Sequence, residues 1–132
     1  MLPIFSRILV VDDSAVARRI YTHMLTRLGY GNVDEATDGR MALEMLTARR
    51  HRLVISDWRM QPMNGLELLA AMQKNVHLMD VPIIITTGRA VKFAEVARQD
   101  DSIHYLIKPF TIAALAEKLR IVTEAAPGRL SA

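Results

Sequence analysis

Short apolar runs alternate along this chain with longer segments in which apolar residues recur every three or four positions. The short runs predict five strands, of which the second is the least apolar: RILVV (7–11), VDEAT (33–37), LVIS (53–56), IIITT (83–87) and YLI (105–107). Parallel strands need long crossover connections, which are usually right-handed helices. The alternation therefore predicts an α/β fold, a doubly wound sheet of five parallel strands with five helices.

Helix-start and helix-stop residues mark where these helices begin and end. Ser14 is a predicted cap and Gly29 a predicted stop for the first helix, Asp38-Gly39 opens the second, and Thr111 caps the last. The third predicted helix extends to Val76, and the fourth spans 91–99. The apolar stripes expected on the first and last helices are Ile20, Met24 and Leu28, then Ile112, Leu115, Leu119 and Val122.

The length of the chain, its lack of cysteine and its charge narrow the classes of protein. A chain of 132 residues that is 51% hydrophobic has the size of one domain, with an expected core at about 7–124 and a frayed tail at 125–132. The absence of cysteine excludes disulfides and cysteine-based zinc sites. No apolar run approaches the roughly 20 residues that span a bilayer, so a soluble, cytoplasmic protein is expected. The basic run at 49–52 accompanies no DNA-reading motif, and nucleic-acid binding is not predicted.

Chemically reactive side chains fall at the carboxyl ends of the predicted strands. Asp12 and Asp13 follow the first strand, Asp57 the third and Lys108 the fifth, while Thr87 ends the fourth. Taken singly, each of these residues is explained as a helix cap, a turn residue or a surface lysine. Taken together, they predict a site, because sites in open parallel sheets form beyond the carboxyl ends of the strands.

Three acids at one edge of a sheet need a positive charge among them. At about 5 Å and an effective dielectric near 20, each like-charge pair costs about 3 kcal/mol. The Lys108 ammonium supplies one positive charge, and a hard divalent cation, Mg²⁺ for preference, supplies the rest. Zinc is a poor alternative, because His104 alone of the four histidines is near a relevant strand, and it precedes that strand.

A neutral pocket of this kind suits the attack of a carboxylate on phosphorus, which gives an acyl phosphate. Asp57 is the expected nucleophile, since it stands singly while Asp12 and Asp13 are better placed to hold metal. Phosphorylation makes the site more negative, so the Thr87 hydroxyl and Lys108 are expected to move to the phosphoryl oxygens.

Four motifs resemble the receiver domains of two-component response regulators, most of all the single-domain chemotaxis regulators of the CheY type. They are ILVVDDS (8–14), VISDWRMQPMNGLELL (54–69), IIITTGRA (83–90) and YLIKPF (105–110). The resemblance extends from about Arg7 to Glu124. It implies a single receiver domain with the flavodoxin-like (βα)5 fold and the strand order 2-1-3-4-5.

The resemblance also implies a role for each site residue. Asp57 would be the phosphoacceptor, and Mg²⁺ would be bound by Asp13, by Asp57 and by the backbone carbonyl of Arg59, with Asp12 acting through water. Thr87 would be the switch hydroxyl and Lys108 the partner of the phosphate. The peptide between Lys108 and Pro109 would be cis.

The same resemblance implies the partners. A histidine kinase, a phosphotransfer protein or a small acyl phosphate would donate the phosphoryl group to Asp57. A downstream protein would bind a face made by the fourth helix, the fifth strand and the fifth helix, where Tyr105 is the aromatic that changes rotamer. The residues expected on this face are Ala90, Tyr105, Ile107 and Lys118. A monomer without a DNA-binding domain is expected, with phosphorylation-linked dimerisation as the alternative.

Three features depart from the family pattern. Gln61 places Pro62 one position later than usual, and the loop RQDDSIHY (98–105) lacks a glycine and looks one residue shorter. Arg59 and Arg89, each two residues beyond a site residue, are both cationic. Positions of this kind tune the lifetime of the acyl phosphate in the family, so we expect the two arginines to alter it.

Other classes of protein fit the sequence less well. An aspartyl-phosphate phosphatase of the haloacid type needs a general acid two residues after its nucleophile, where this chain has Arg59. A flavodoxin-like cofactor binder would place a phosphate beside Asp12 and Asp13, which would repel it. We therefore predict a phosphoacceptor that gains and loses its own phosphoryl group and is not a turnover enzyme. Within that class a phosphorelay intermediate, a phosphate sink and an isolated receiver of a larger regulator remain alternatives.

Overall fold

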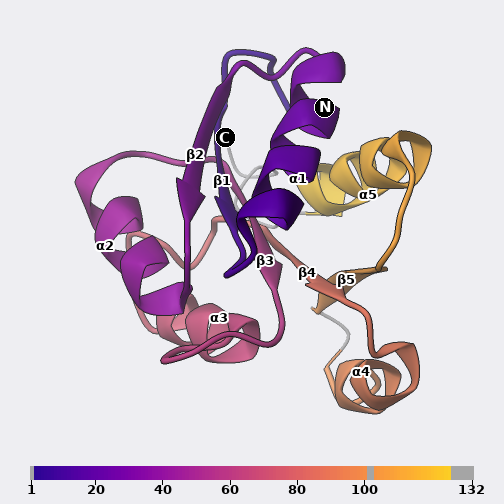
Figure 1. Cartoon of the computed structure of the whole chain (residues 1–132). Coiled ribbons are helices and arrows are strands. Elements are labelled where there is room, and N and C mark those ends of the chain that lie inside the picture. The colour runs from indigo at the N-terminus through magenta and orange to yellow at the C-terminus, as the bar shows by residue number, and fades with distance from the viewer. Residues whose placement is uncertain (1, 101–102, 126–132) are drawn as a thin grey trace.

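Five parallel strands, each followed by a helix, make up the computed structural model, which describes residues 2–100 and 103–125 (Figure 1). The side chains of Ala90, Val91 and Ala125 are outside that description. The strands are β1 (Arg7–Val11), β2 (Asn32–Ala36), β3 (Leu53–Asp57), β4 (Ile83–Thr87) and β5 (His104–Ile107). The helices are α1 (Ala15–Arg27), α2 (Gly39–Ala48), α3 (Gly65–Gln73), α4 (Ala90–Ala97) and α5 (Ile112–Ala125).

The sheet has the order β2-β1-β3-β4-β5, which confirms the predicted doubly wound fold. Its strand order reverses between β1 and β3, where Val11 is in register with Ser56. On the other side of β3, Asp57 is in register with Thr86. The carboxyl ends of the three central strands therefore lie side by side, at the edge where the sequence places its reactive residues.

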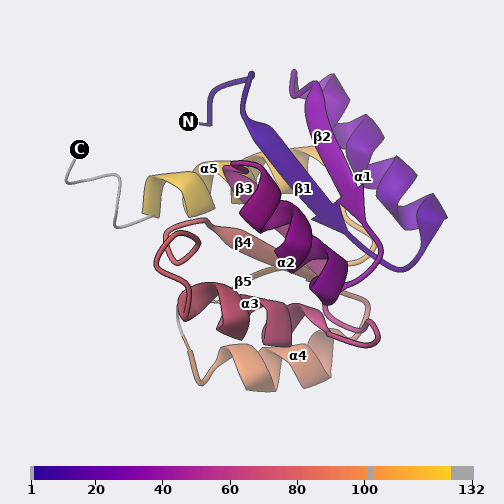
Figure 2. The ribbon, with the colours of Figure 1, turned by 90° about the vertical axis from the view of Figure 1, so that its left-hand side faces the viewer.

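Two hydrophobic cores cover the two faces of this sheet. Successive side chains of a strand point to opposite faces, so Ile8 and Val10 join one core while Leu9 and Val11 join the other. The first core lies under α1 and α5, and the second lies under α2, α3 and α4 (Figure 2). The sheet is buried on both faces, as the continuous apolar runs predicted. No helix among the described residues is long and apolar enough to cross a membrane.

Most predicted helix ends are confirmed by cap hydrogen bonds. The Ser14 hydroxyl accepts a bond from the backbone N–H of Ala17 (3.2 Å), and Thr111 caps α5 in the same way. Asp38 is the N-cap of α2. Gly29 has a φ of +102°, in the left-handed region that glycine adopts without strain, and it follows the end of α1.

Other predicted boundaries were wrong. Helix α3 ends at Gln73, because the chain turns at Asn75, whose side chain accepts a bond from the N–H of His77 (2.8 Å). Val76 is therefore outside the helix and 74% exposed. Helix α4 spans Ala90–Ala97 and not 91–99.

The predicted apolar stripes need a correction on α1 as well. Ile20 is 48% exposed. The buried residues of this helix are Tyr21 and Leu25, each one position later in the sequence than the predicted Ile20 and Met24. Met24 and Leu28 are partly buried and pack against the core, as predicted. On α5, Leu115, Leu119 and Val122 are buried as predicted, whereas Ile112 is only partly buried. Residues 126–132 of the predicted tail are outside the described residues.

The basic run at 49–52 contributes to a partly buried cluster of charged and polar side chains at the opposite edge of the sheet from the predicted site. The His51 ring is fully buried, and its Nε2 is 2.8 Å from a carboxylate oxygen of Asp34 on β2. Arg7 on β1 donates to the same carboxylate at 3.2 Å, and Arg49 is 3.8 Å from it. This cluster ties β1, β2 and the start of β3 together.

We expect Asp34→Ala to lower the free energy of unfolding by about 1–3 kcal/mol at neutral pH, because His51 would lose its partner in a buried position. Burial tends to raise the pKa of Asp34, but the hydrogen bond of His51 and the charge of Arg7 outweigh burial and lower it. The stabilisation is therefore present above the pKa of the unfolded chain and is lost as pH falls through the lower folded pKa. Urea unfolding at pH 7 and pH 3 measures both effects, with Asp80→Ala as the exposed control; equal stability of both variants at pH 7 would contradict the prediction.

Candidate functional site

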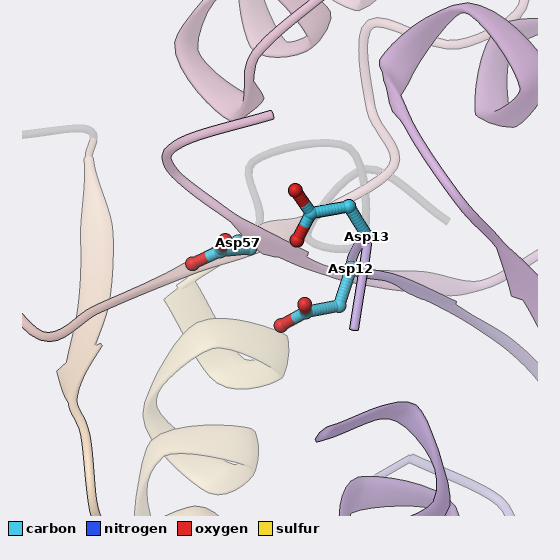
Figure 3. A group of neighbouring side chains, drawn as sticks. All are labelled: Asp12, Asp13 and Asp57. Carbon is cyan, nitrogen blue, oxygen red and sulfur yellow. The ribbon is translucent and has the colours of Figure 1, made fainter. Parts of the chain in front are cut away.

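Three carboxylates meet at the carboxyl ends of β1 and β3. Asp12, Asp13 and Asp57 each offer one oxygen, and these oxygens all lie within 4.8 Å of one another (Figure 3). They meet because β1 and β3 are neighbours in register, so that the residues following β1 lie beside the last residue of β3. The predicted acidic cluster is therefore present.

The three acids differ in how firmly they are held. Asp12 is almost fully buried, and one of its oxygens accepts a bond from the backbone N–H of Ser14 (2.9 Å). Its backbone carbonyl accepts a bond from Arg18 on α1 (2.7 Å). The Asp57 side chain is 12% exposed, whereas Asp13 is exposed. Asp12 and Asp57 are thus aimed by the fold, and Asp13 can adjust to a ligand.

Lys108 brings its ammonium between two of these carboxylates. Its Nζ is 2.9 Å from Oδ1 of Asp57 and 3.1 Å from Oδ2 of Asp12. Its backbone N–H donates to the carbonyl of Thr87 (2.8 Å), which extends the pairing of β5 with β4 to this residue. The peptide between Lys108 and Pro109 is cis, as the resemblance implied.

The pKa values of the pair reflect this environment. Burial raises the pKa of Asp57, and the charges of Asp12 and Asp13 act in the same direction, while Lys108 opposes them. Burial tends to lower the pKa of Lys108, but the hydrogen bond and the charge of Asp57 outweigh it and raise that pKa above its ordinary value. Lys108 is therefore a permanent cation at neutral pH.

Thr87 lies at the end of β4, and its hydroxyl oxygen accepts a hydrogen bond. The side chain is buried, and its oxygen accepts a bond from the backbone N–H of Arg89 (2.9 Å). Arg89 is the N-cap of α4 and makes no side-chain cap bond. Any movement of the Thr87 hydroxyl away from this N–H changes how the first turn of α4 is held.

A line of aromatic rings leads from the acids to the predicted partner face. The Trp58 ring meets the Phe93 ring edge-on, with centroids 5.0 Å apart, and Phe93 is 5.1 Å from Tyr105. Lys118 lies over the Tyr105 ring, with its Nζ 5.9 Å from the ring centroid. Phe93 is fully buried between the other two rings, and the sequence analysis did not single it out. The signal that could have identified it is that Phe93 is the single aromatic residue in α4.

Three residues of the predicted partner face lie together on β5 and α5. Tyr105 is partly exposed and Ile107 is 37% exposed, both on β5, and Lys118 on α5 contacts the Tyr105 ring. Ala90 begins α4, but its side chain is outside the described part of the chain.

A cleft of about 320 Å³ opens beside the acids. It is lined by Asp13, Trp58, Arg59, Met60, Gln61 and Asn64. The Arg59 guanidinium lies over the Trp58 ring, 4.6 Å from its centroid, at the wall of this cleft. The loop contains a second cis peptide, between Gln61 and Pro62, and Asn64 is the N-cap of α3.

The donor set fits a hard divalent cation. Asp12, Asp13 and Asp57 offer only carboxylate oxygens, which suit Mg²⁺ better than zinc or copper. Their mutual distances are short enough for one ion to contact or to bridge through water to all three.

The chain is similar to known proteins over most of its length. The family model described as the response regulator receiver domain matches residues 8–120. Chemotaxis protein CheY1 of Helicobacter pylori is 39% identical over 118 residues, covering 88% of this chain and 95% of that protein. Chemotaxis protein CheY-3 of Vibrio cholerae is 36% identical over 119 residues, covering 89% and 92%.

Solved structures show the same fold. The structure of chemotaxis protein CheY4 of Vibrio cholerae matches with a TM-score of 0.79 and 30% identity, covering 89% of this chain and 98% of that chain. The receiver domain of sensor histidine kinase PA1611 from Pseudomonas aeruginosa matches with a TM-score of 0.82 and 27% identity, covering 92% and 99%. The latter structure has a magnesium ion coordinated in its active site cleft.

Proposed function

Because this chain belongs to the response regulator receiver domain family, we propose that it is the phosphoacceptor of a two-component signalling system. A histidine kinase or a phosphotransfer protein transfers a phosphoryl group to Asp57, and the modified protein controls a downstream partner in the cytoplasm. The observation that carries this proposal is the position of Asp57, at the end of a buried strand, within 4.8 Å of two acids and 2.9 Å from the Lys108 ammonium. The names of the CheY relatives favour chemotaxis or motility as the process.

Asp57 acts as the nucleophile in this proposal. Its Oδ1 pairs with Lys108, so Oδ2 is the oxygen that attacks phosphorus. A bond from Asp57 to phosphorus forms, and the bond from phosphorus to the donor's imidazole nitrogen or carboxylate oxygen breaks. The donor group leaves with the bonding electrons, and the acyl phosphate remains on Asp57.

Asp13, Asp57 and the backbone carbonyl of Arg59 would hold Mg²⁺, with Asp12 contributing through water. When bound, the ion offsets the negative charge of the carboxylates and of the incoming phosphoryl oxygens. Lys108 supplies the remaining positive charge through its contacts with Asp12 and Asp57.

The proposed output follows from the change of charge at Asp57, which exchanges one negative charge for about two. The Thr87 hydroxyl turns to the phosphoryl oxygens and releases the N–H of Arg89 at the start of α4. Phe93 of α4 packs against Tyr105, so a shift of the helix changes the position of that ring. The face made by α4, β5 and α5 then binds its partner with altered affinity.

Two neighbouring proposals remain within the same class. A phosphorelay intermediate or a phosphate sink would use the same chemistry and differ only in its partners, as would a receiver cut from a larger regulator. Turnover as a phosphatase is disfavoured, because the residue two positions after Asp57 is Arg59 and not the carboxylic acid that would serve as general acid. We propose that Arg59 and Arg89 instead set the lifetime of the acyl phosphate.

Intact-protein mass spectrometry after incubation with acetyl phosphate tests the proposed function. The wild-type protein is expected to gain one phosphoryl group only when Mg²⁺ is present, and to lose it in hydroxylamine. The decay of this mass gain after removal of the donor gives the lifetime, which Arg89→Ala is expected to change and Arg98→Ala to leave alone. Absence of any gain, with acetyl phosphate or with a phosphorylated histidine kinase, would reject the phosphoacceptor proposal.

A further inference from the structure

Tyr21 on α1 lies beside the ammonium group of Lys108. The Lys108 Nζ lies 5.9 Å from the centroid of the Tyr21 ring. A side-chain hydrogen bond with Lys108 is one of the interactions that act on the phenol. Tyr21 is 7% exposed, so its ring and hydroxyl have little freedom to turn to solvent.

Carboxylates account for two of the bonds that the Lys108 ammonium can donate. A lysine ammonium has three N–H donors and no acceptor. Oδ1 of Asp57 accepts one bond at 2.9 Å and Oδ2 of Asp12 accepts another at 3.1 Å. The Tyr21 phenol also interacts with this ammonium, and it carries no charge, because burial raises the pKa of Tyr21 above its already high ordinary value.

Tyr21 is itself held against the segment that carries Lys108. Its ring stacks on the ring of Phe110, with centroids 5.1 Å apart and an interplanar angle of 21°. Phe110 comes two residues after Lys108, so one aromatic pair joins α1 to the loop between β5 and α5. The phenol oxygen is thereby fixed relative to both elements.

We propose that Tyr21 is a positioning residue for Lys108. Its phenol oxygen holds the ammonium in place between Asp12 and Asp57 before phosphoryl transfer. It also keeps one N–H bonded while the other two turn from the carboxylates to the phosphoryl oxygens. The proposal rests on the phosphoacceptor function of Asp57 and names a residue on α1 that this function needs.

Tyr21→Phe is the informative variant, because it keeps the stacked ring and removes only the oxygen. The matched control is Tyr30→Phe, which removes another buried hydroxyl, one that donates to the backbone carbonyl of Leu2 (2.8 Å). We expect Tyr21→Phe to slow phosphorylation by acetyl phosphate about threefold to tenfold, the range that corresponds to one net hydrogen bond. Tyr30→Phe is expected to keep the wild-type rate.

A second measurement does not depend on phosphorylation. The chain has four lysines, so the Lys108 ammonium can be assigned by NMR in ¹⁵N-lysine protein with a Lys108→Met reference. Tyr21→Phe is expected to shift this nitrogen resonance and to speed the exchange of its protons with water. Tyr30→Phe is expected to leave both unchanged, which separates positioning from a general loss of stability.

The two measurements distinguish a failure of the positioning role from a failure of the phosphoacceptor function. An unchanged rate together with an unchanged Lys108 resonance in Tyr21→Phe overturns the proposal, and so do equal changes in Tyr30→Phe. If the wild-type protein takes up no phosphoryl group, the phosphoacceptor function fails. The NMR comparison then still decides whether Tyr21 positions the ammonium.

Discussion

An Asp57→Asn protein is expected to take up no hydroxylamine-labile phosphoryl group and yet to melt at a higher temperature than the wild type in metal-free buffer. The loss of uptake is complete, because an amide has no carboxylate oxygen to form the acyl phosphate. The side chains have nearly the same shape, and the amide oxygen can still accept a bond from Lys108, so the fold is retained.

The gain in stability follows from the raised pKa of Asp57. Burial, together with the charges of Asp12 and Asp13, raises this pKa above that of the unfolded chain. A carboxyl with a raised folded pKa contributes most to stability below its unfolded pKa, and that contribution is lost as pH rises through the folded pKa. At neutral pH the ionised Asp57 therefore lowers stability, and the neutral amide removes this effect.

Thermal melting at pH 7 and pH 4 in the presence of a chelator measures the change. The difference between Asp57→Asn and wild type should shrink toward pH 4, where the wild-type carboxyl is partly protonated. Asp80→Asn, an exposed acid in the loop before β4, is the control and should melt like the wild type. A variant less stable than wild type at pH 7 would show that the bond to Lys108 outweighs burial and charge repulsion.

Gly65→Ala is expected to destabilise the protein by about 2–4 kcal/mol and to disturb the site at the same time. A Cβ at residue 65 would lie 2.4 Å from the backbone oxygen of Asp57 and 3.2 Å from the Cδ1 of Ile85. The neighbour is backbone and cannot turn aside, so the loop between β3 and α3 must move away from the strand. That loop is held at this point by a bond from the N–H of Gly65 to the carbonyl of Trp58 (3.0 Å), which the movement would weaken.

Urea unfolding gives the loss of stability, and Trp58 fluorescence during a Mg²⁺ titration reports on the site. Gly31→Ala is the matched control, because a Cβ there meets nothing within 4 Å and the residue does not have a positive φ. It is expected to be neutral or slightly stabilising. A Gly65→Ala protein that is as stable as Gly31→Ala and binds Mg²⁺ unchanged would contradict the prediction. It would mean that the loop between β3 and α3 makes room for the added methyl group without loss of stability.

The acidic site could be predicted from the chain almost completely. Asp12, Asp13 and Asp57 follow buried strands, and residues at the carboxyl ends of neighbouring parallel strands must converge once the strand order is known. The same reasoning placed Lys108, which the structure shows within 3.1 Å of two of the acids. Local caps could also be predicted, since the Ser14 hydroxyl accepts its bond from Ala17 within the same helix turn.

The errors arose where periodicity alone was used. Ile20 and Val76 both fit a helical repeat, yet one is exposed on α1 and the other lies beyond the end of α3. A repeat gives the spacing of a stripe, whereas the angle at which the helix packs on the sheet decides which neighbouring stripe is buried. That angle depends on side chains from distant elements.

The sequence by itself thus determined the sheet, its two covered faces and the acids at its edge, because these follow from local patterns and from the rules that connect parallel strands. Only the tertiary structure decided that Tyr21 contacts Lys108, and that Phe93 lies between Trp58 and Tyr105. These contacts join residues far apart along the chain and depend on how helices pack on the sheet. Packing of this kind is set by the shapes of all the side chains in a core at once, and no single motif records it.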